Sequence, residues 1–240
     1  ALPCEEWIPV DVKFSVVGQS VKSTLYSFSD CQAIVKKAVV ERLKGVYDVD
    51  WFDETGAEYT IQVALLKDIV TLTIDTSGSS LHKRGYRANA LDAPLKETLA
   101  AAMIELSYWN KDRVLMDPFC GSGTIPIEAA MIARNIAPGL NRHFASEKWD
   151  RVPEKLWKEE RKKAYAAIDY DCMPEIYGSD IDPAAIELAK SNAELAGVDD
   201  CITFEVKPEL ELELYGDYGC LITNPPYGER LGDMKTVEDM

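Results

Sequence analysis

The first stretch in which polar and apolar residues follow a regular period is residues 10–17. Their alternation predicts a strand with one buried face. Apolar residues then recur at helical spacing between Asp30, which can cap a helix, and Gly45, which can end one. Two further apolar runs, at 59–65 and 69–74, predict strands joined by a tight turn. This part of the chain therefore predicts a β-α-β-β unit.

From residue 94 onward, short apolar runs alternate with segments of helical periodicity. The predicted strands cover residues 114–117, 175–180, 202–206 and 218–223, and the predicted helices cover 94–106, 125–134 and 183–196. Such an alternation is typical of an α/β fold with a parallel sheet. Residues 137–171, rich in Trp, Lys and Glu, interrupt it, and we expect them to form a partly helical insertion.

Composition places the chain among ordinary globular proteins. Of its 240 residues, 47% are hydrophobic and 28% are charged, which excludes a chain that is mostly disordered. No apolar run approaches the roughly 18 residues of a membrane-spanning helix, and no signal-peptide pattern is present, so we expect a cytoplasmic protein. The six cysteines form no CxxC pair and there are two histidines, so the sequence predicts neither a metal site nor disulfides.

The net charge of −15 first argues against nucleic acid as a partner, because proteins that bind it gain affinity from basic surfaces. The acidity is unevenly distributed, however. Residues 1–90 carry 10 basic and 12 acidic side chains, whereas residues 91–240 carry 16 and 29. The most basic short stretch, residues 82–87, lies at the end of the first region. The charge therefore indicates only where nucleic acid is not expected to dock.

A strand that ends in an acidic residue and leads into a glycine loop is the strongest local signal. Asp117 ends the strand, and Gly121 and Gly123 precede the next helix. Glycines let a ligand approach the backbone closely, and the helix N-terminus behind them offers unpaired N–H groups. A nicotinamide dinucleotide is disfavoured because Pro126 stands where its third glycine belongs, and a P-loop is excluded because no Gly-Lys-Ser/Thr follows. A tight turn without a ligand is the alternative.

The next predicted strand ends near two aspartates, Asp180 and Asp182. An acidic side chain at this place is suited to accept hydrogen bonds from the hydroxyls of a ribose. Asp182 directly precedes Pro183 and a helix, which favours a role as N-cap. Asp180 is therefore the better candidate for the ribose ligand.

A third signal follows the last predicted strand, at Asn224-Pro225-Pro226-Tyr227. The two prolines restrict the backbone and push Asn224 into an extended conformation. The result is a rigid corner that presents the Asn224 amide oxygen and the Pro225 carbonyl beside an aromatic ring. Two acceptors and a stacking surface suit a planar group with an exocyclic NH₂, such as a nucleobase flipped out of its stack. A bare Pro-Pro turn is the alternative.

These three signals together point to a known family. The segments that carry the resemblance are Asp117–Thr124, Gly178–Pro183 and Asn224–Leu231, with 84–87 and 93–97 upstream. They resemble the S-adenosylmethionine-dependent methyltransferases of the THUMP-containing rRNA guanine-N2 type, whose members are often labelled N6-adenine-specific DNA methylases. Residues 10–75 resemble the C-terminal part of a THUMP domain, so the resemblance covers nearly the whole chain.

The resemblance implies a fold and a domain order. Residues 91–240 are expected to form a Rossmann-like class I methyltransferase domain of α/β type, with 137–171 as its insertion. Residues 1–90 are expected to form an α+β THUMP-like RNA-binding module and a linker. The family has a further N-terminal half of this module and three more strands after Met240, so we expect the sequence to be part of a longer chain.

The resemblance also implies an activity and a set of site residues. The activity is methyl transfer from S-adenosylmethionine to guanine N2 in 23S rRNA, by an in-line displacement that depends mostly on positioning. The residues expected at the cofactor are Asp117, Gly121, Gly123, Thr124, Asp180, Ile181, Pro94 and Leu95. Those expected at the target base are Asn224, Pro225, Pro226 and Tyr227, and those expected at the RNA are Lys83, Arg84 and Arg87.

Three alternatives stay open. An adenine-N6 DNA methylase shares the chemistry, but the THUMP-like residues favour RNA. An inactive nucleic-acid-binding fragment is the second, and a nicotinamide oxidoreductase, in which Asn224-Pro225-Pro226-Tyr227 has no role, is a distant third. One departure from the family lies at Lys207-Pro208-Glu209, where an acidic or polar residue usually contacts adenine. Either Glu209 makes that contact or it is lost.

Overall fold

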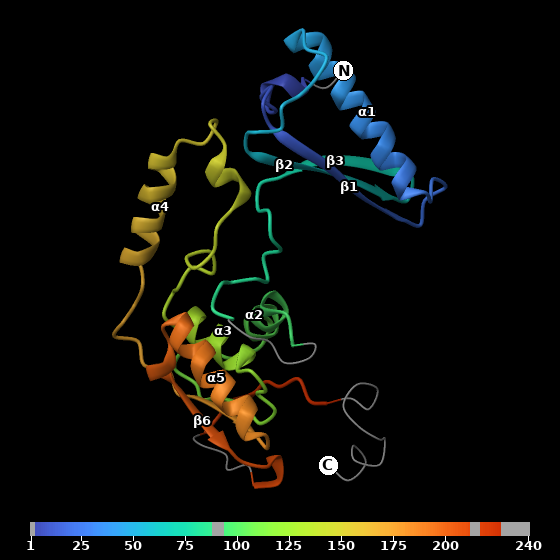
Figure 1. Ribbon diagram of the computed structural model, residues 1–240. Helices are drawn as coiled ribbons and strands as arrows, with labels where there is room; N and C mark the ends of the chain where they lie inside the picture. Colours follow the sequence, from blue (N-terminus) through green and yellow to red (C-terminus); the bar gives the residue numbers. More distant parts are fainter. Residues whose placement is uncertain (1–2, 88–93, 212–216, 227–240) are drawn as a thin grey trace. The chain divides into compact units, whose positions relative to one another are not determined.

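The computed structural model describes residues 3–87, 94–211 and 217–226 (Figure 1). The chain divides into two compact units. The first unit consists of residues 1–80 and 143–159, and the second consists of 81–142 and 160–240. Within the described residues, no helix combines the length and apolar character needed to cross a bilayer.

The first unit is a three-stranded sheet with one long helix. Its strands are β1 (Lys13–Val21), β2 (Glu58–Leu66) and β3 (Ile69–Asp75), in the order β1-β2-β3, and the 3-10 helix η1 (Cys4–Glu6) precedes them. β1 pairs with β2 in parallel and β2 with β3 antiparallel, so that Val16 lies opposite Ile61 and Ile61 opposite Ile74. The helix α1 (Phe28–Tyr47) connects the two parallel strands. The predicted β-α-β-β order is confirmed.

The ends of α1 differ from those that the sequence predicted. Ser27 rather than Asp30 is the N-cap residue, and the helix continues through Gly45 to Tyr47. It ends where Asp48 takes a left-handed conformation with φ of 53°. Val39 and Leu43 on its inner face are buried, and this packing outweighs the modest cost of a glycine inside a helix.

A segment from the middle of the chain completes the core of the first unit. Trp149 is only 5% exposed and stacks on Tyr59, with ring centroids 4.1 Å apart and an angle of 8° between the planes. Its indole N–H donates to the Glu58 carbonyl over 3.2 Å. The sequence predicted residues 143–159 as part of an insertion in the second domain. In the structure they pack in the first unit, whose leading part ends at Ser80, and residues 81–87 belong to the second unit.

The second unit is a parallel sheet covered by helices. Its strands are β4 (Leu115–Asp117), β5 (Ile176–Asp180), β6 (Ile202–Val206) and β7 (Cys220–Leu221), in the order β6-β5-β4-β7. Its helical elements are α2 (Glu97–Leu106), α3 (Thr124–Ala133), α5 (Pro183–Ala196), η3 (Asp199–Cys201) and η4 (Glu209–Glu211). The helix α4 (Glu154–Ala166) begins in the first unit and ends in the second, and η2 (Ala145–Lys148) belongs to the first. The predicted parallel α/β sheet is confirmed.

The strand order sets where a ligand can bind. The sheet grows from β4 to β5 and β6 on one side and to β7 on the other. The direction of winding therefore reverses between β4 and β7, and open α/β sheets bind ligands outside the carboxyl ends of the strands at such a point. The preceding helix α2 begins at Glu97 and not at the predicted Pro94, because Lys96 is extended (φ −69°, ψ 133°) and serves as N-cap.

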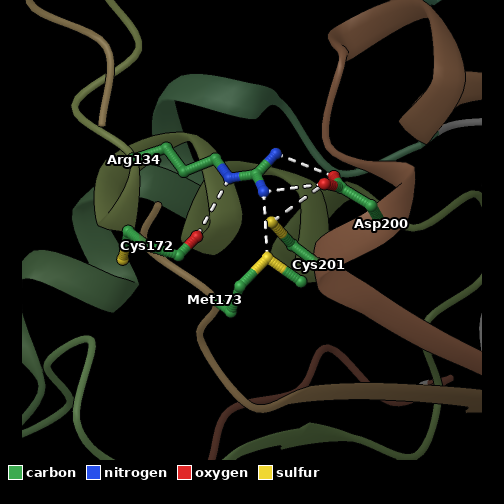
Figure 2. A network of polar contacts seen from close by, with 5 residues as sticks. All are labelled: Arg134, Cys172, Met173, Asp200 and Cys201. Carbon is green, nitrogen blue, oxygen red and sulfur yellow. Dashed lines mark hydrogen bonds and ion pairs between the residues drawn. The ribbon is translucent and has the colours of Figure 1, made fainter. Parts of the chain in front are cut away.

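At the amino-terminal ends of β5 and β6, the buried guanidinium of Arg134 at the end of α3 binds several groups (Figure 2). Arg134 donates to both carboxylate oxygens of Asp200 over 2.7 and 2.8 Å, and to the Cys172 carbonyl over 3.1 Å. A further contact, of 3.2 Å, reaches the Met173 sulfur. Arg134 holds the pKa of Asp200 below its usual value. The bidentate pair joins α3 to the segment before β6, and the contacts with Cys172 and Met173 join it to the segment before β5.

Candidate functional site

Polar side chains from three strands gather at the carboxyl edge of the second unit's sheet. β4, β5 and β7 run parallel, so their carboxyl ends lie at the same edge. Asp117 ends β4, Asp180 ends β5, and Asn224 follows shortly after β7. The structure therefore brings the three sequence signals to one place.

The glycine loop between β4 and α3 depends on two left-handed residues with different surroundings. Gly121 has φ of 51° and Gly123 has φ of 80°. A Cβ on Gly123 would lie 3.0 Å from the Ala189 Cβ and 3.1 Å from the Phe204 ring, whereas a Cβ on Gly121 would meet nothing within 4 Å. Gly123 is thus required for packing, and Gly121 leaves open space in the loop that a ligand can fill.

Asp180 connects this loop to the end of β5. One carboxylate oxygen accepts from the Gly121 N–H and the other from the Asp182 N–H, each over 3.0 Å. A carboxylate can accept about four hydrogen bonds, so both oxygens keep acceptor capacity. Ile181 beside it is 64% exposed. The free acceptor sites of Asp180 suit the hydroxyls of a ribose, and the exposed apolar side chain of Ile181 suits the face of an adenine ring.

Asp182 has the capping role that the sequence favoured. Its carboxylate accepts from the Ala184 N–H over 2.9 Å at the start of α5, with Pro183 as the first helical residue. This confirms Asp182 as the N-cap and leaves Asp180 as the aspartate available to a ligand.

Asp117 is buried and makes its contacts within the protein. It is 3% exposed, and its Oδ1 atom accepts from the Phe119 N–H over 3.2 Å and from the Thr223 hydroxyl over 2.7 Å. Burial raises its pKa to about 7, and the negative charge of Asp180 acts in the same direction. Asp117 therefore holds the start of the glycine loop through the hydrogen bond from the Phe119 N–H.

Arg87 contacts two residues predicted at the cofactor, Thr124 and Leu95, and also Glu97. Its guanidinium donates to the Thr124 hydroxyl over 2.7 Å and lies 3.5 Å from the Leu95 carbonyl and from the Glu97 carboxylate. Thr124 is itself buried at the start of α3. The contacts of Arg87 thus hold the segment of Pro94 and Leu95 against the end of the glycine loop.

Arg84 is likewise engaged inside the second unit. It forms an ion pair of 3.3 Å with Glu128, which also accepts from the Tyr86 hydroxyl over 3.1 Å. Burial raises the pKa of Glu128, and Arg84 opposes that effect. The side chains of Arg84 and Arg87 are 11% and 14% exposed. Of the three residues that the sequence predicted at the RNA, Lys83 alone is classed as exposed.

The corner after β7 lies at the surface of the second unit. Asn224 and Pro225 are exposed and Pro226 is half-buried. Tyr227, the predicted stacking residue, lies outside the described residues. The Thr223 hydroxyl joins this corner to Asp117, the residue before the glycine loop.

Sequence reasoning missed several residues that shape the site. Asn192 on α5 is fully buried and donates from its amide to the Ser122 carbonyl in the glycine loop over 3.0 Å. Glu128 is buried in α3. Each is a polar residue at a position of the apolar helix face, and that break in the periodic pattern is the signal that could have revealed it. Thr223 carries no such signal, because a threonine is common in strands.

Two family models match the chain. Residues 84–240 match the UPF0020 family, described as an RMKL-like methyltransferase domain, and residues 1–75 match the THUMP domain.

Two relatives cover most or all of the chain. A protein of Bacillus subtilis (strain 168) named "Putative RNA methyltransferase YpsC" is 50% identical over an alignment of 243 positions, which covers 100% of this chain and 63% of that protein. The "Ribosomal RNA large subunit methyltransferase K/L" of Shewanella sediminis (strain HAW-EB3) is 44% identical over 94% of this chain and 32% of its own length. The chain therefore spans less than two thirds of either relative.

Two solved structures have the same fold. The first is described as a predicted N6-adenine-specific DNA methylase from Listeria monocytogenes str. 4b F2365, with a TM-score of 0.91 and 52% identity over 99% of this chain and 63% of that one. The second, "SMU.472, a putative methyltransferase complexed with SAH", has a TM-score of 0.89 and 43% identity over 100% of this chain and 64% of that one.

Proposed function

This chain belongs to the UPF0020 family of RMKL-like methyltransferase domains and carries a THUMP domain before it, and from this we propose that the protein methylates RNA. The methyl donor is S-adenosylmethionine and the acceptor is the exocyclic amine of a base. The observation that carries the proposal is the meeting of the glycine loop, Asp180 and the exposed acceptors of Asn224 and Pro225 at one edge of the sheet.

The cofactor site is proposed around Asp180 and the glycine loop. The free acceptor capacity of the Asp180 carboxylate suits the two ribose hydroxyls, and exposed Ile181 suits the adenine face. The open space at Gly121 accommodates the amino-acid end of the ligand. The SAH bound to a relative that is 43% identical supports this cofactor. When bound, the cofactor supplies a methyl group on a positively charged sulfur.

The corner after β7 is proposed to hold the target amine. The Asn224 amide oxygen and the Pro225 carbonyl accept the two N–H groups, which turns the nitrogen lone pair toward the methyl group. Tyr227 stacks on the flipped base. The chain supplies positioning of the nucleophile and no strong base before transfer.

RNA is favoured over DNA because of the THUMP match over residues 1–75 and because a 44% identical relative is named for large-subunit rRNA. On this basis we assign guanine N2 of 23S rRNA as the target. Adenine N6 in DNA is the second candidate, supported by the description of the Listeria structure. Lys83 is the residue of the 82–87 stretch that we retain as an RNA contact, since Arg84 and Arg87 serve within the protein.

The test is transfer of labelled methyl from S-adenosylmethionine to deproteinised rRNA and to unmethylated DNA, side by side, with nucleoside analysis of the product. The proposal expects label on rRNA as N2-methylguanosine. Label on DNA alone would replace it by the second candidate, and RNA binding without S-adenosylmethionine binding would indicate an inactive fragment. Asn224→Ala should abolish transfer while S-adenosylhomocysteine affinity stays within about threefold, because the amide acts on the amine alone.

A further inference from the structure

The pairing of β4 with β7 is followed by a side-chain hydrogen bond between Thr223 and Asp117. Backbone bonds run from the Cys220 N–H to the Val114 carbonyl (2.8 Å) and from the Ile222 N–H to the Met116 carbonyl (3.0 Å). Beyond Ile222 the ladder stops, and the two prolines at 225 and 226 have no N–H with which to continue it. In the part of the chain that the structure describes, the next contact between the strands is the Thr223 hydroxyl on Asp117, over 2.7 Å.

This hydrogen bond shares its acceptor atom with a hydrogen bond from the glycine loop. Asp117 Oδ1 accepts from the Phe119 N–H, which belongs to the loop, and from Thr223, which directly precedes the amine-accepting corner. Asp117 ends a β-strand and is 3% exposed, so its carboxylate lies in the interior of the second unit. A shift of Oδ1 or a loss of either donor would change the distance between loop and corner.

We propose that Thr223 is a positioning residue, whose hydroxyl fixes the Asn224–Pro225 corner against the glycine loop through Asp117. This inference rests on the proposed function, because it assigns Thr223 a part in aligning the amine with the methyl group. A misplacement of about 1 Å between reacting groups can reduce a rate on the order of 100-fold. A side chain that touches neither reactant can therefore control the rate.

The charges around Asp117 provide an independent way to observe the bond. Asp180 at the end of β5 and burial raise the Asp117 pKa, while the hydrogen bonds from Thr223 and Phe119 lower it. Burial and the negative charges of both aspartates raise the pKa of the Cys120 thiol in the loop. Loss of the Thr223 hydroxyl removes a donor that favours the ionised carboxylate, so the pKa of Asp117 should rise further.

The experiment compares Thr223→Val, which has the same shape without a hydroxyl, with Thr223→Ser, which keeps the hydroxyl. Thr203→Val, at an exposed position of β6, is the matched control. We expect Thr223→Val to lower kcat about 10- to 100-fold, as for a lost hydrogen bond to a charged group. S-adenosylhomocysteine affinity, from calorimetry, should stay within about threefold, and Thr223→Ser and Thr203→Val should keep kcat within about threefold of wild type.

The second measurement does not need turnover. Carbon-13 NMR of labelled aspartate carboxylates, with Asp117→Asn to assign the signal, follows the Asp117 titration in the unbound protein. The pKa of Asp117 should rise in Thr223→Val and return in Thr223→Ser.

Three outcomes would overturn the inference: unchanged kcat in Thr223→Val, a loss of cofactor affinity as large as the loss of kcat, or an unchanged Asp117 pKa. If the wild-type protein transfers no methyl to any nucleic acid, the proposed function fails instead. The NMR titration would still test the Thr223–Asp117 bond in that case.

Discussion

Asp117 is the residue at which burial acts most directly on the chemistry of the site. Its pKa is raised from an ordinary value of 3.8 to about 7, mainly by burial. The folded protein therefore binds a proton there between these two values, whereas the unfolded chain does not. The stability gained from that proton is fully present below about pH 4 and is lost as the pH rises through about 7.

The first prediction follows from this sign. Asp117→Asn removes the titration, so between pH 5 and pH 8 the wild type should lose about 2–3 kcal/mol of unfolding free energy more than the variant does. Urea unfolding at the two pH values measures it. A difference between the two proteins that does not change with pH would show that Asp117 titrates in its ordinary range.

Arg87 and Lys83 lie four residues apart but have different surroundings. Arg87 contacts Thr124 and Glu97 inside the second unit, whereas Lys83 is exposed. We predict that Arg87→Met weakens S-adenosylhomocysteine binding about tenfold, as for a lost hydrogen bond to a charged group, with little change in RNA affinity. Lys83→Met should do the opposite and reduce the salt dependence of RNA binding by about one unit of slope. Calorimetry and filter binding at several salt concentrations separate the two, and the reverse pattern would restore Arg87 as an RNA contact.

At the scale of elements, the two glycines of the glycine loop have different roles: Gly123 is needed for packing, and Gly121 leaves space for a ligand. Gly123→Ala should destabilise the protein by about 1–3 kcal/mol, because its Cβ would press on Ala189 and Phe204 in a left-handed backbone. Gly121→Ala carries the same left-handed strain but meets no neighbour within 4 Å, so it should cost less than Gly123→Ala, yet it should weaken S-adenosylhomocysteine binding. Thermal unfolding and calorimetry on both variants test this pair. Equal losses of stability would contradict the assignment.

The elements that the sequence predicted best are those with local signals at both ends. α5 runs from Pro183 to Ala196 as predicted, because Asp182 caps it and Gly197 ends it with φ of 72°. α1 was predicted too short because Gly45 carries a stop signal that tertiary packing overrides. β7 covers two residues of the six predicted, since hydrophobicity marks burial and not the point where pairing ends.

In the candidate site, too, the sequence predicts some features from local signals and does not predict those that depend on tertiary contacts. Asp180, Gly121 and Asn224 follow directly from their places after predicted strands, and parallel strands bring such places together. The contacts of Arg87 with Thr124 and of Thr223 with Asp117 join residues that are 37 and 106 positions apart. No sequence periodicity predicts a contact between such distant residues, so these hydrogen bonds could be identified only from the structure.

For the whole molecule, the main difference from expectation is the destination of residues 143–159. The charged and aromatic composition of this segment suggested an insertion within one domain. Its Trp149 instead stacks on Tyr59, 90 positions earlier in the chain, and fills the core of the first unit. A sheet of three strands with one helix has little apolar area to bury, so a large aromatic side chain from elsewhere adds substantially to its stability.

This leads to the prediction that Trp149 stabilises the first unit selectively. Trp149→Ala removes a buried ring, its stacking on Tyr59 and a hydrogen bond to Glu58, and should cost about 3–5 kcal/mol. Hydrogen exchange should accelerate in β2 and β3, while β5 and β6, which belong to the other unit, should keep their protection. Trp51→Ala, at a position that is 81% exposed, is the matched control and should change neither. Equal acceleration in both sheets would mean that the two units unfold together. The loss of the Trp149 ring would then destabilise the glycine loop as well.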